Sequence, residues 1–416
     1  MLPRHTEEVS SAEILSRAFA GLTWLLALGW VWWLVQWARH LPEVHDLTLE
    51  TTEAQPANPK ATALTVIVPA CNEQEAIAAT LRSLLRSEGI RLQIVAVNDR
   101  STDCTGDIMD AVASEYRRHS EATGSSSLHS LEVLHIGGLP PEWLGKPHAL
   151  ALAALQARSE WLLFTDGDVL FAPNALALAL SHALVTMTDH LILMPDWITH
   201  SLSEASMHGA LHALSTWTMR PWRVADPNAP DFLGIGAFNL VRRSVYEELG
   251  GFTSLRMEVL EDLRLGWKVK RAGFRQRVVL GPGLVSVRWS VGAWGVVRNL
   301  EKNLFALYRY NLLIALGATA GLALQVVWPL VALAVGGWAR GGAIVWFAAI
   351  AGLYVISRRM TRVAPYCAAF YPLGAALFCF AHVRSIGSAL WRAGVVWRGT
   401  LYRLDDLRAY AGRSWK

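Results

Sequence analysis

The stretch from residue 64 to residue 116 alternates between two kinds of apolar pattern, and this alternation constrains the fold more than any other feature. Residues 64–70 and 92–99 are continuous apolar runs rich in β-branched side chains, as expected of strands buried on both faces of a sheet. Residues 76–86 and 105–116 have helical spacing instead. Strand, helix, strand and helix at this spacing predict an α/β fold with a parallel sheet and right-handed crossovers.

Acidic side chains stand where the predicted strands end. Glu73 follows the first strand, Asp99 ends the second, and Asp166 and Asp168 directly follow an apolar run at 161–164. Because ligands on parallel sheets bind beyond the carboxyl ends of the strands, we expect these four carboxylates at one edge. Two carboxylates one residue apart can both reach a hard divalent cation, which would relieve their repulsion. The alternative is a solvated turn for Asp-Gly-Asp and a structural role for the other acids at strand-to-helix turns.

Four motifs in this order resemble the signature of family 2 glycosyltransferases: residues 66–73, 97–103, 166–168 and 261–262. The resemblance covers residues 62–290. It implies an inverting enzyme with the GT-A nucleotide-sugar-binding fold, which is a mostly parallel sheet flanked by helices. It also implies a nucleotide-diphosphate sugar as donor, with a UDP-sugar as the first expectation.

The resemblance further implies a set of donor-binding residues: Pro69, Ala70, Glu73, Asp99, Lys146 and Asp166. Within this set, Asp99 and Glu73 would contact the base and ribose of the nucleoside. Asp166 and Asp168 would hold Mg²⁺ or Mn²⁺ on the diphosphate, with Asp168 as the more direct ligand. Lys146 precedes a predicted helix at 149–157, where an ammonium and backbone amides suit a phosphate; a solvated lysine is the alternative.

The family pattern places the proton-accepting carboxylate at the second acid of the 261–262 pair. Asp262 is therefore the expected catalytic base, and Glu261 is expected to orient it. The alternative is purely structural, because acids at a helix N-terminus are stabilised by the helix dipole in any case. His208 and His212 have a spacing that can bind metal on a helix, but no third ligand is evident nearby, so a structural pair is expected.

Other segments narrow the range of acceptors that the sequence predicts. Residues 138–146 resemble a segment of hopanoid-biosynthesis-associated glycosyltransferases, and the membrane layout is also similar to that of ceramide glucosyltransferases and carotenoid glycosyltransferases. Processive polysaccharide synthases of the family carry Gln-x-x-Arg-Trp where this chain has Arg-Asn-Leu-Glu-Lys at 298–302. This departure favours one sugar added to a lipid acceptor of hopanoid, sphingolipid, carotenoid or polyprenyl type. A processive synthase and an inactive membrane scaffold are the alternatives. Tryptophans at 217, 222, 289 and 294 could line an apolar acceptor path or lie at the headgroup boundary.

The chain is too apolar for an ordinary soluble enzyme, with 53% hydrophobic and 17% charged residues. Residues 18–37 carry no charge and are long enough to cross a bilayer, and no small-x-small cleavage site follows them. Further apolar blocks lie at 312–335, 341–356 and 364–381. Together they predict an integral membrane protein of the cytoplasmic membrane.

Basic residues near the ends of these segments indicate the cytoplasmic side: Arg39, His40, Arg358, Arg359 and Arg362. They place the catalytic domain in the cytoplasm. Three C-terminal spans would then put the arginine-rich tail on the opposite side of the membrane. Either one of the three segments is re-entrant or interfacial, or the preference of basic residues for the cytoplasmic side is broken here. We favour a re-entrant or interfacial segment. The net charge of +4 gathers near the membrane and in the tail, which suits anionic lipid and needs no nucleic acid.

The expected organisation has six parts. An N-terminal anchor at 1–42 and a linker at 43–61 precede the glycosyltransferase domain at 62–290. An interfacial amphipathic helix at 291–311, a C-terminal transmembrane region at 312–385 and a basic tail at 386–416 follow.

Overall fold

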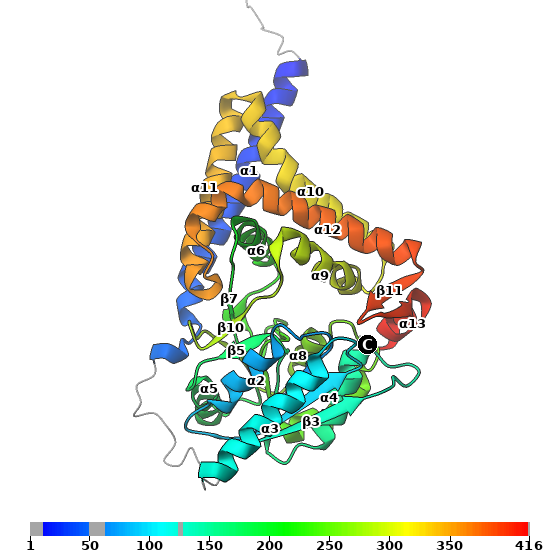
Figure 1. The fold of residues 1–416 in the computed structure, drawn as a ribbon. Helices are drawn as coiled ribbons and strands as arrows, with labels where there is room; N and C mark the ends of the chain where they lie inside the picture. Colours follow the sequence, from blue (N-terminus) through cyan, green and yellow to red (C-terminus); the bar gives the residue numbers. More distant parts are fainter. Residues whose placement is uncertain (1–10, 50–62, 124–127, 415–416) are drawn as a thin grey trace, which may run out of the picture.

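The computed structural model describes residues 11–49, 63–123 and 128–414. A body built on a β-sheet, residues 63–290, lies below a group of long helices (Figure 1). The main sheet has seven strands in the order β3-β2-β1-β4-β8-β6-β9. Their bounds are β1 (Ala63–Ala70), β2 (Arg91–Asp99), β3 (His129–Ile136), β4 (Trp161–Phe164), β6 (His190–Leu193), β8 (Asn239–Arg242) and β9 (Gln276–Val279).

The predicted parallel sheet is confirmed. β1 pairs in parallel with both β2 and β4, and β2 pairs in parallel with β3. Only β8 runs antiparallel to its neighbours β4 and β6. A smaller sheet of order β5-β10-β7 contains β5 (Val169–Phe171), β7 (Asp196–Trp197) and β10 (Val285–Val287).

Helices cover both faces of the main sheet. One core joins the strands to α2 (Ile77–Leu85), α3 (Thr105–Thr123) and α5 (Ala175–Val185). The core on the other face contains α4 (Gly145–Leu155), α7 (Arg243–Glu248) and α8 (Glu261–Arg271). Val66 and Val68 face the first core and Ile67 the second, which explains why β1 is an unbroken apolar run.

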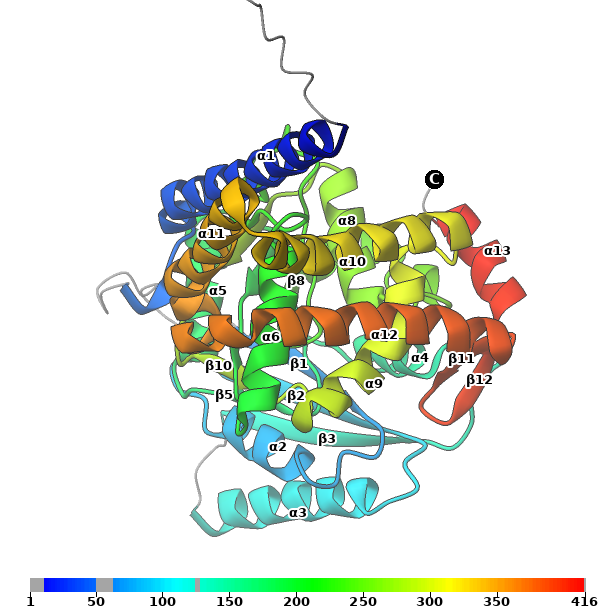
Figure 2. The ribbon, with the colours of Figure 1, turned by 90° about the horizontal axis from the view of Figure 1, so that it is seen from above.

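Among the described residues, four helical segments are long and apolar enough to cross a membrane: Ser11–Glu43, Leu312–Val335, Gly337–Thr361 and Pro365–Trp391. Their main helices are α1 (Ser11–His40), α10 (Leu312–Val335), α11 (Gly337–Thr361) and α12 (Tyr371–Trp391). α1, α10 and α11 rise away from the body, whereas α12 lies across it (Figures 1 and 2).

α12 packs along two helices that connect to the body, α6 (Leu202–Ser215) and α9 (Gly292–Leu307). Gly374 allows this approach, because a Cβ atom there would come within 2.5 Å of the Ser206 carbonyl oxygen. The Ser385 hydroxyl donates to the Glu301 carbonyl at 2.6 Å and accepts from the Phe305 amide at 2.9 Å. α12 is therefore attached to the body along much of its length.

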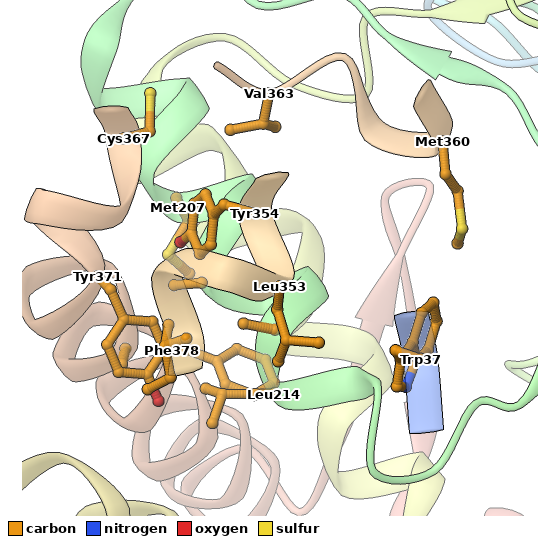
Figure 3. Packing of buried hydrophobic residues seen from close by; sticks show 14 of the residues in the cluster. Trp37, Met207, Leu214, Leu353, Tyr354, Met360, Val363, Cys367, Tyr371 and Phe378 are labelled. Atoms are coloured by element: carbon orange, nitrogen blue, oxygen red, sulfur yellow. The ribbon is translucent and has the colours of Figure 1, made fainter. Parts of the chain in front are cut away.

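The largest apolar cluster joins α6 to the long helices. Met207 and Leu214 of α6 pack with Leu353 and Tyr354 of α11, and Tyr371 of α12 belongs to the same cluster (Figure 3). Buried side chains from the body and from the long helices thus form one continuous core, which packs the body directly against these helices.

Two of the apolar blocks belong to helical segments that extend further along the chain than the sequence indicated. The block expected at 341–356 lies within α11, which continues to Thr361. The block expected at 364–381 includes a 3-10 helix, Pro365–Phe370, and the first half of α12, which continues to Trp391. The added helical turns carry arginines, and the long side chain of one of them, Arg384, reaches a polar partner by donating to Glu301 at 2.7 Å. The expected linker at 43–61 also begins as ordered chain: Leu47 is fully buried, and its amide donates to the Leu280 carbonyl at 2.9 Å. Residues 50–61 of that linker lie outside the described residues.

The expected basic tail is a folded element. Beyond α12, a C-terminal hairpin of β11 (Gly394–Trp397) and β12 (Thr400–Arg403) leads into α13 (Leu404–Ser414). Both elements pack beside the carboxyl edge of the main sheet (Figure 1). The tail therefore lies on the same side of the long helices as the body.

Candidate active site

The carboxyl edge of the sheet borders a cavity of about 500 Å³, here called the charged cavity. The ends of β1 and β4 contribute Pro69, Glu73, Asp166 and Asp168 to one wall. The opposite wall comes from α9, α12 and the C-terminal hairpin, and it carries five cations: Arg298, Lys302, Arg384, Arg392 and Arg398. Three of the four acids expected at this edge are therefore together, and cations face them.

Lys146 joins the two acidic motifs. It lies in the first turn of α4, and its Nζ is 2.6 Å from Asp166 Oδ1 and 2.7 Å from Glu261 Oε1. Burial disfavours the ammonium, but the charges of Asp166 and Glu261 outweigh it and hold the pKa of Lys146 well above its usual range. Burial alone would raise the pKa of Asp166, but Lys146 outweighs it and lowers that pKa. Instead of standing free for a phosphate, Lys146 is thus part of a buried ion-pair network.

Within the described part of the chain, neither Asp168 nor Glu73 forms an ion pair with Lys146, unlike Asp166 and Glu261. Burial and the charges of Asp166 and Glu73 raise the pKa of Asp168 to about 7. Burial and the charge of Asp166 raise the pKa of Glu73 as well. The described residues hold no cluster of three or more His, Cys, Asp or Glu side chains arranged for a metal. Mg²⁺ on a diphosphate needs only one or two carboxylates, with phosphate oxygens and waters as the other ligands, so Asp166 and Asp168 fit such an ion.

Asp262 lies at the N-terminus of α8. Its carboxylate accepts a hydrogen bond from the Leu263 amide at 2.7 Å. Burial and the neighbouring charge of Glu261 raise the pKa of Asp262 to about 6. A carboxylate with this pKa is mostly ionised at neutral pH and accepts a proton more readily than an ordinary aspartate.

The glycine-rich segment at 232–239 lets backbone lie against these acids. A Cβ atom on Gly234 would come within 1.9 Å of the Asp262 carbonyl oxygen. One on Gly236 would come within 2.3 Å of Asp166 Oδ2. Any larger residue at either position would displace an acid of the site.

Asp99 does not line the charged cavity. Its side chain is fully buried, with Oδ1 accepting from Arg100 Nε at 2.8 Å and Oδ2 from Arg398 Nη1 at 2.7 Å. Burial opposes ionisation, but the hydrogen bonds and charges of these arginines outweigh it and lower the pKa of Asp99. Asp99 therefore needs no bound metal ion to offset its charge, because two guanidinium groups already neutralise it.

A second cavity of about 360 Å³, here called the apolar cavity, opens beside Asp262. Its walls are mostly apolar, with Met194, Trp197, Leu211, Met219 and Met360 among them. It shares six lining residues with the charged cavity: Lys146, Asp166, Trp289, Lys302, Asn303 and Trp397. The two cavities therefore meet at the acids, and the apolar one extends to the end of α11.

Sequence reasoning missed Lys302, Trp397 and Met360, which all lie beyond residue 290. The spacing of 292–310 indicates a helix but not that Lys302 faces inward, with its Nζ 4.8 Å from the Trp397 ring centroid. Burial lowers the pKa of Lys302 to about 8. No pattern in the basic tail marks Trp397 as buried.

The histidine pair and the tryptophans occupy the region between body and long helices. The His208 ring lies 4.9 Å from the Trp197 ring, and His212 lies 5.7 Å from the Trp37 ring. Burial lowers the pKa of both histidines to about 4, so both are neutral at pH 7. Trp289 borders both cavities, whereas Trp217 stacks on Trp33.

Comparison with known proteins finds similarity to one family over part of the chain. Residues 65–250 match the family described as Glycosyl transferase family 2. A 4,4'-diaponeurosporenoate glycosyltransferase from Staphylococcus aureus strain MRSA252 is 24% identical over 206 residues, which are 49% of this chain and 50% of the relative. The same enzyme from strain USA300 is 23% identical over the same length. The chain thus spans about half the length of these curated relatives.

Solved structures with a similar arrangement include a mannosyltransferase from Pyrobaculum calidifontis in complex with GDP-Man and Mn²⁺. It has a TM-score of 0.47 and 20% identity, and the match covers 87% of this chain and 98% of that one. Staphylococcus aureus TarS has a TM-score of 0.39 and 17% identity, with 60% of this chain and 40% of that one covered.

Proposed function

Because residues 65–250 match the family described as Glycosyl transferase family 2, we propose that this chain is a glycosyltransferase of that family and transfers a sugar from a nucleotide-diphosphate sugar to a membrane lipid. The observation that carries the proposal is the junction of the two cavities at Asp166 and Lys146. One cavity is lined by charges and suits a nucleoside diphosphate. The other is lined by apolar side chains and suits the body of a lipid. Asp262 borders the apolar cavity, where an acceptor hydroxyl would lie.

The donor would occupy the charged cavity. Pro69 and Glu73 line its sheet side, and the cations on the opposite wall would offset phosphate charge. Asp166 and Asp168 would hold Mg²⁺ or Mn²⁺, which when bound would supply Lewis-acid stabilisation of the departing diphosphate. A UDP-sugar remains the first donor to test.

The chemistry assigned to the chain's own residues is a single displacement. Asp262 takes the proton of the acceptor hydroxyl, and that oxygen forms a bond to the anomeric carbon of the sugar. The bond from that carbon to the diphosphate oxygen breaks, and its electron pair leaves with the diphosphate. Attack opposite to the leaving group inverts the anomeric centre. Glu261 and Lys146 keep Asp262 beside the junction through the ion pair at 2.7 Å.

The acceptor would enter from the membrane side. Met360 and Thr361, at the end of α11, and Leu211 of α6 line the apolar cavity, so it reaches the helices that would lie in the bilayer. A hydrophobic alcohol of hopanoid, sphingolipid, carotenoid or polyprenyl type would place its apolar part there. Its hydroxyl would then point at Asp262.

The placement of α12 supports a membrane topology with three spans. If α1, α10 and α11 cross the bilayer and α12 lies along its surface, the body and the tail are on one side. Arg39 at the end of α1 and Arg358 and Arg359 at the end of α11 are then on that same side. The excess of basic residues assigns that side to the cytoplasm of the inner membrane.

The test is transfer by the full chain in lipid nanodiscs. UDP-glucose, UDP-N-acetylglucosamine and GDP-mannose are supplied one at a time with Mn²⁺ and a total lipid extract. We expect one donor to give a lipid whose mass has increased by a single sugar. Long oligosaccharide products would instead identify a processive synthase. If none of the three donors is consumed, the proposal is contradicted for these donors.

A further inference from the structure

The tip of the C-terminal hairpin has an unusual residue in its turn. The two-residue loop Arg398-Gly399 has positive φ at both positions, 49° and 74°. Such loops strongly favour Asn, Asp or Gly, because other side chains crowd the left-handed backbone. An arginine held in this conformation indicates that its side chain makes contacts that compensate for the strain.

Those contacts are with the end of β2, about three hundred residues earlier in the chain. Arg398 Nη1 donates to Asp99 Oδ2 at 2.7 Å, across a sequence separation of 299 residues. Arg100 Nη1 donates to the Thr400 hydroxyl at 3.3 Å. The Gly145 amide donates to the Tyr402 hydroxyl at 3.2 Å. The hairpin is thus attached to the sheet edge at three points, with Asp99 fully enclosed between two arginines.

The attached hairpin forms part of the charged cavity. Residues 394–398 line it consecutively, on the side opposite Glu73 and Asp168. Trp397 is 9% exposed and borders both cavities, with Lys302 above its ring. Without the hairpin, this wall would consist of α9 and α12 alone.

We propose that Asp99 is the docking point of the C-terminal hairpin, and that the docked hairpin completes the binding site for the nucleoside diphosphate. Arg398 is a positioning residue: it pairs with Asp99 and holds Trp397 in the cavity wall. The identity of the ligand rests on the proposed function, whereas the docking contact does not. The assignment differs from the expectation that Asp99 itself contacts the nucleoside.

Hydrogen exchange of the hairpin tests the docking. The full chain in detergent is compared with Asp99→Asn and with Arg398→Ala, and exchange is followed for peptides covering 394–403. We expect both variants to speed exchange there, and Asp99→Asn to do so although it lies on a different element. Asp107→Asn, an exposed acid on α3, is the matched control and should leave the hairpin unchanged. Unchanged exchange in both variants would overturn the docking.

Nucleotide binding tests whether the docked hairpin completes the binding site for the nucleoside diphosphate. UDP and GDP, each with Mn²⁺, are titrated into the wild type, Arg398→Ala and the hairpin control Arg403→Ala, whose side chain is exposed. We expect bound nucleotide to slow exchange of the hairpin. Arg398→Ala should weaken nucleotide binding about tenfold, because it undocks the hairpin and releases Trp397 from the cavity wall. Equal affinity in Arg398→Ala and wild type would refute the role of the hairpin in binding.

The two failures are distinguishable. If neither nucleotide binds the wild type while Asp99→Asn still loosens the hairpin, the proposed function fails and the docking stands. A double variant of Asp99→Asn and Arg398→Ala should weaken nucleotide binding no more than Arg398→Ala alone, because both changes break one contact. A further additive loss would assign Asp99 to the nucleoside instead.

Discussion

The body supplies three carboxylates, Lys146 and Trp289 to the charged cavity, whereas α9, α12 and the C-terminal hairpin supply five cations, Glu301 and the indole ring of Trp397. The carboxylates come from the ends of neighbouring strands, so the sheet itself holds them together. The cations come from a helix, a second helix and a turn that meet only through tertiary packing. The comparison suggests a division of roles: the body carries the reacting groups, and the C-terminal part shapes the cavity and balances its charge.

Removing the proposed base should reduce turnover more than any other substitution that we propose. A small effect would contradict the idea that the body carries the reacting groups. We expect Asp262→Asn to lower turnover about 10³-fold, because an amide cannot accept the acceptor's proton. Nucleotide affinity, measured by calorimetry with Mn²⁺, should stay within about twofold, since Asp262 does not line the charged cavity. Asp107→Asn serves as the exposed control. Turnover of Asp262→Asn above a tenth of the wild-type rate would remove Asp262 from the mechanism.

The ion pairs of the two regions should contribute differently to the free energy of unfolding, because they are buried to different extents. Lys146 is 13% exposed between two carboxylates, and we expect Lys146→Met to lower the free energy of unfolding by about 3 kcal/mol, because it leaves buried charges unpaired. Arg392, 44% exposed beside Glu301, is the comparison in the C-terminal part, where Arg392→Met should cost less than about 1 kcal/mol. Chemical denaturation of both variants in detergent provides the measurement. Similar losses in the two variants would contradict the burial argument.

The sequence could predict the residues that the body contributes to this site better than those that the C-terminal part contributes. Two apolar runs and the acids after them were enough to place Glu73, Asp166 and Asp168 at one edge, because a parallel sheet brings its strand ends together. Asp99 also ends a strand, but Arg398 donates to it and separates it from the cavity. A local sequence pattern cannot predict a partner that lies 299 residues away. Lys302 and Trp397 belong to the same class, since their positions depend on how α12 lies on the body.

The pH dependence should have one limb from each region. The pKa of Asp262 is raised to about 6, so its carboxylate is present above that pH and is lost as the pH falls. The rates are compared at saturating Mn²⁺, which would keep Asp168 ionised, so that Asp262 sets the acid limb. The pKa of Lys302 is lowered to about 8, so its ammonium is present below that pH and is lost as the pH rises. We therefore expect a bell-shaped kcat/KM profile that falls about tenfold per pH unit on each side.

Substitution separates the two limbs. Lys302→Arg should remove the alkaline limb, because a guanidinium stays charged, and should leave the acid limb in place. Rates are measured between about pH 4.5 and 9.5, a range that extends beyond both pKa values. An alkaline limb that persists unchanged in Lys302→Arg would assign it to another group and would separate the C-terminal part from the chemistry.

The smallest effect should come from the apolar cavity, where the two regions share one surface. Leu211 of α6 lines it, and we expect Leu211→Trp to raise KM for the lipid acceptor by about threefold to tenfold by filling space that the lipid would occupy. KM for the donor should not change, because Leu211 is absent from the lining of the charged cavity. Leu202→Trp, at the exposed start of the same helix, is the matched control. If Leu211→Trp raised KM for the donor instead, the two cavities would not bind different substrates, and the acceptor would have to approach Asp262 by another path.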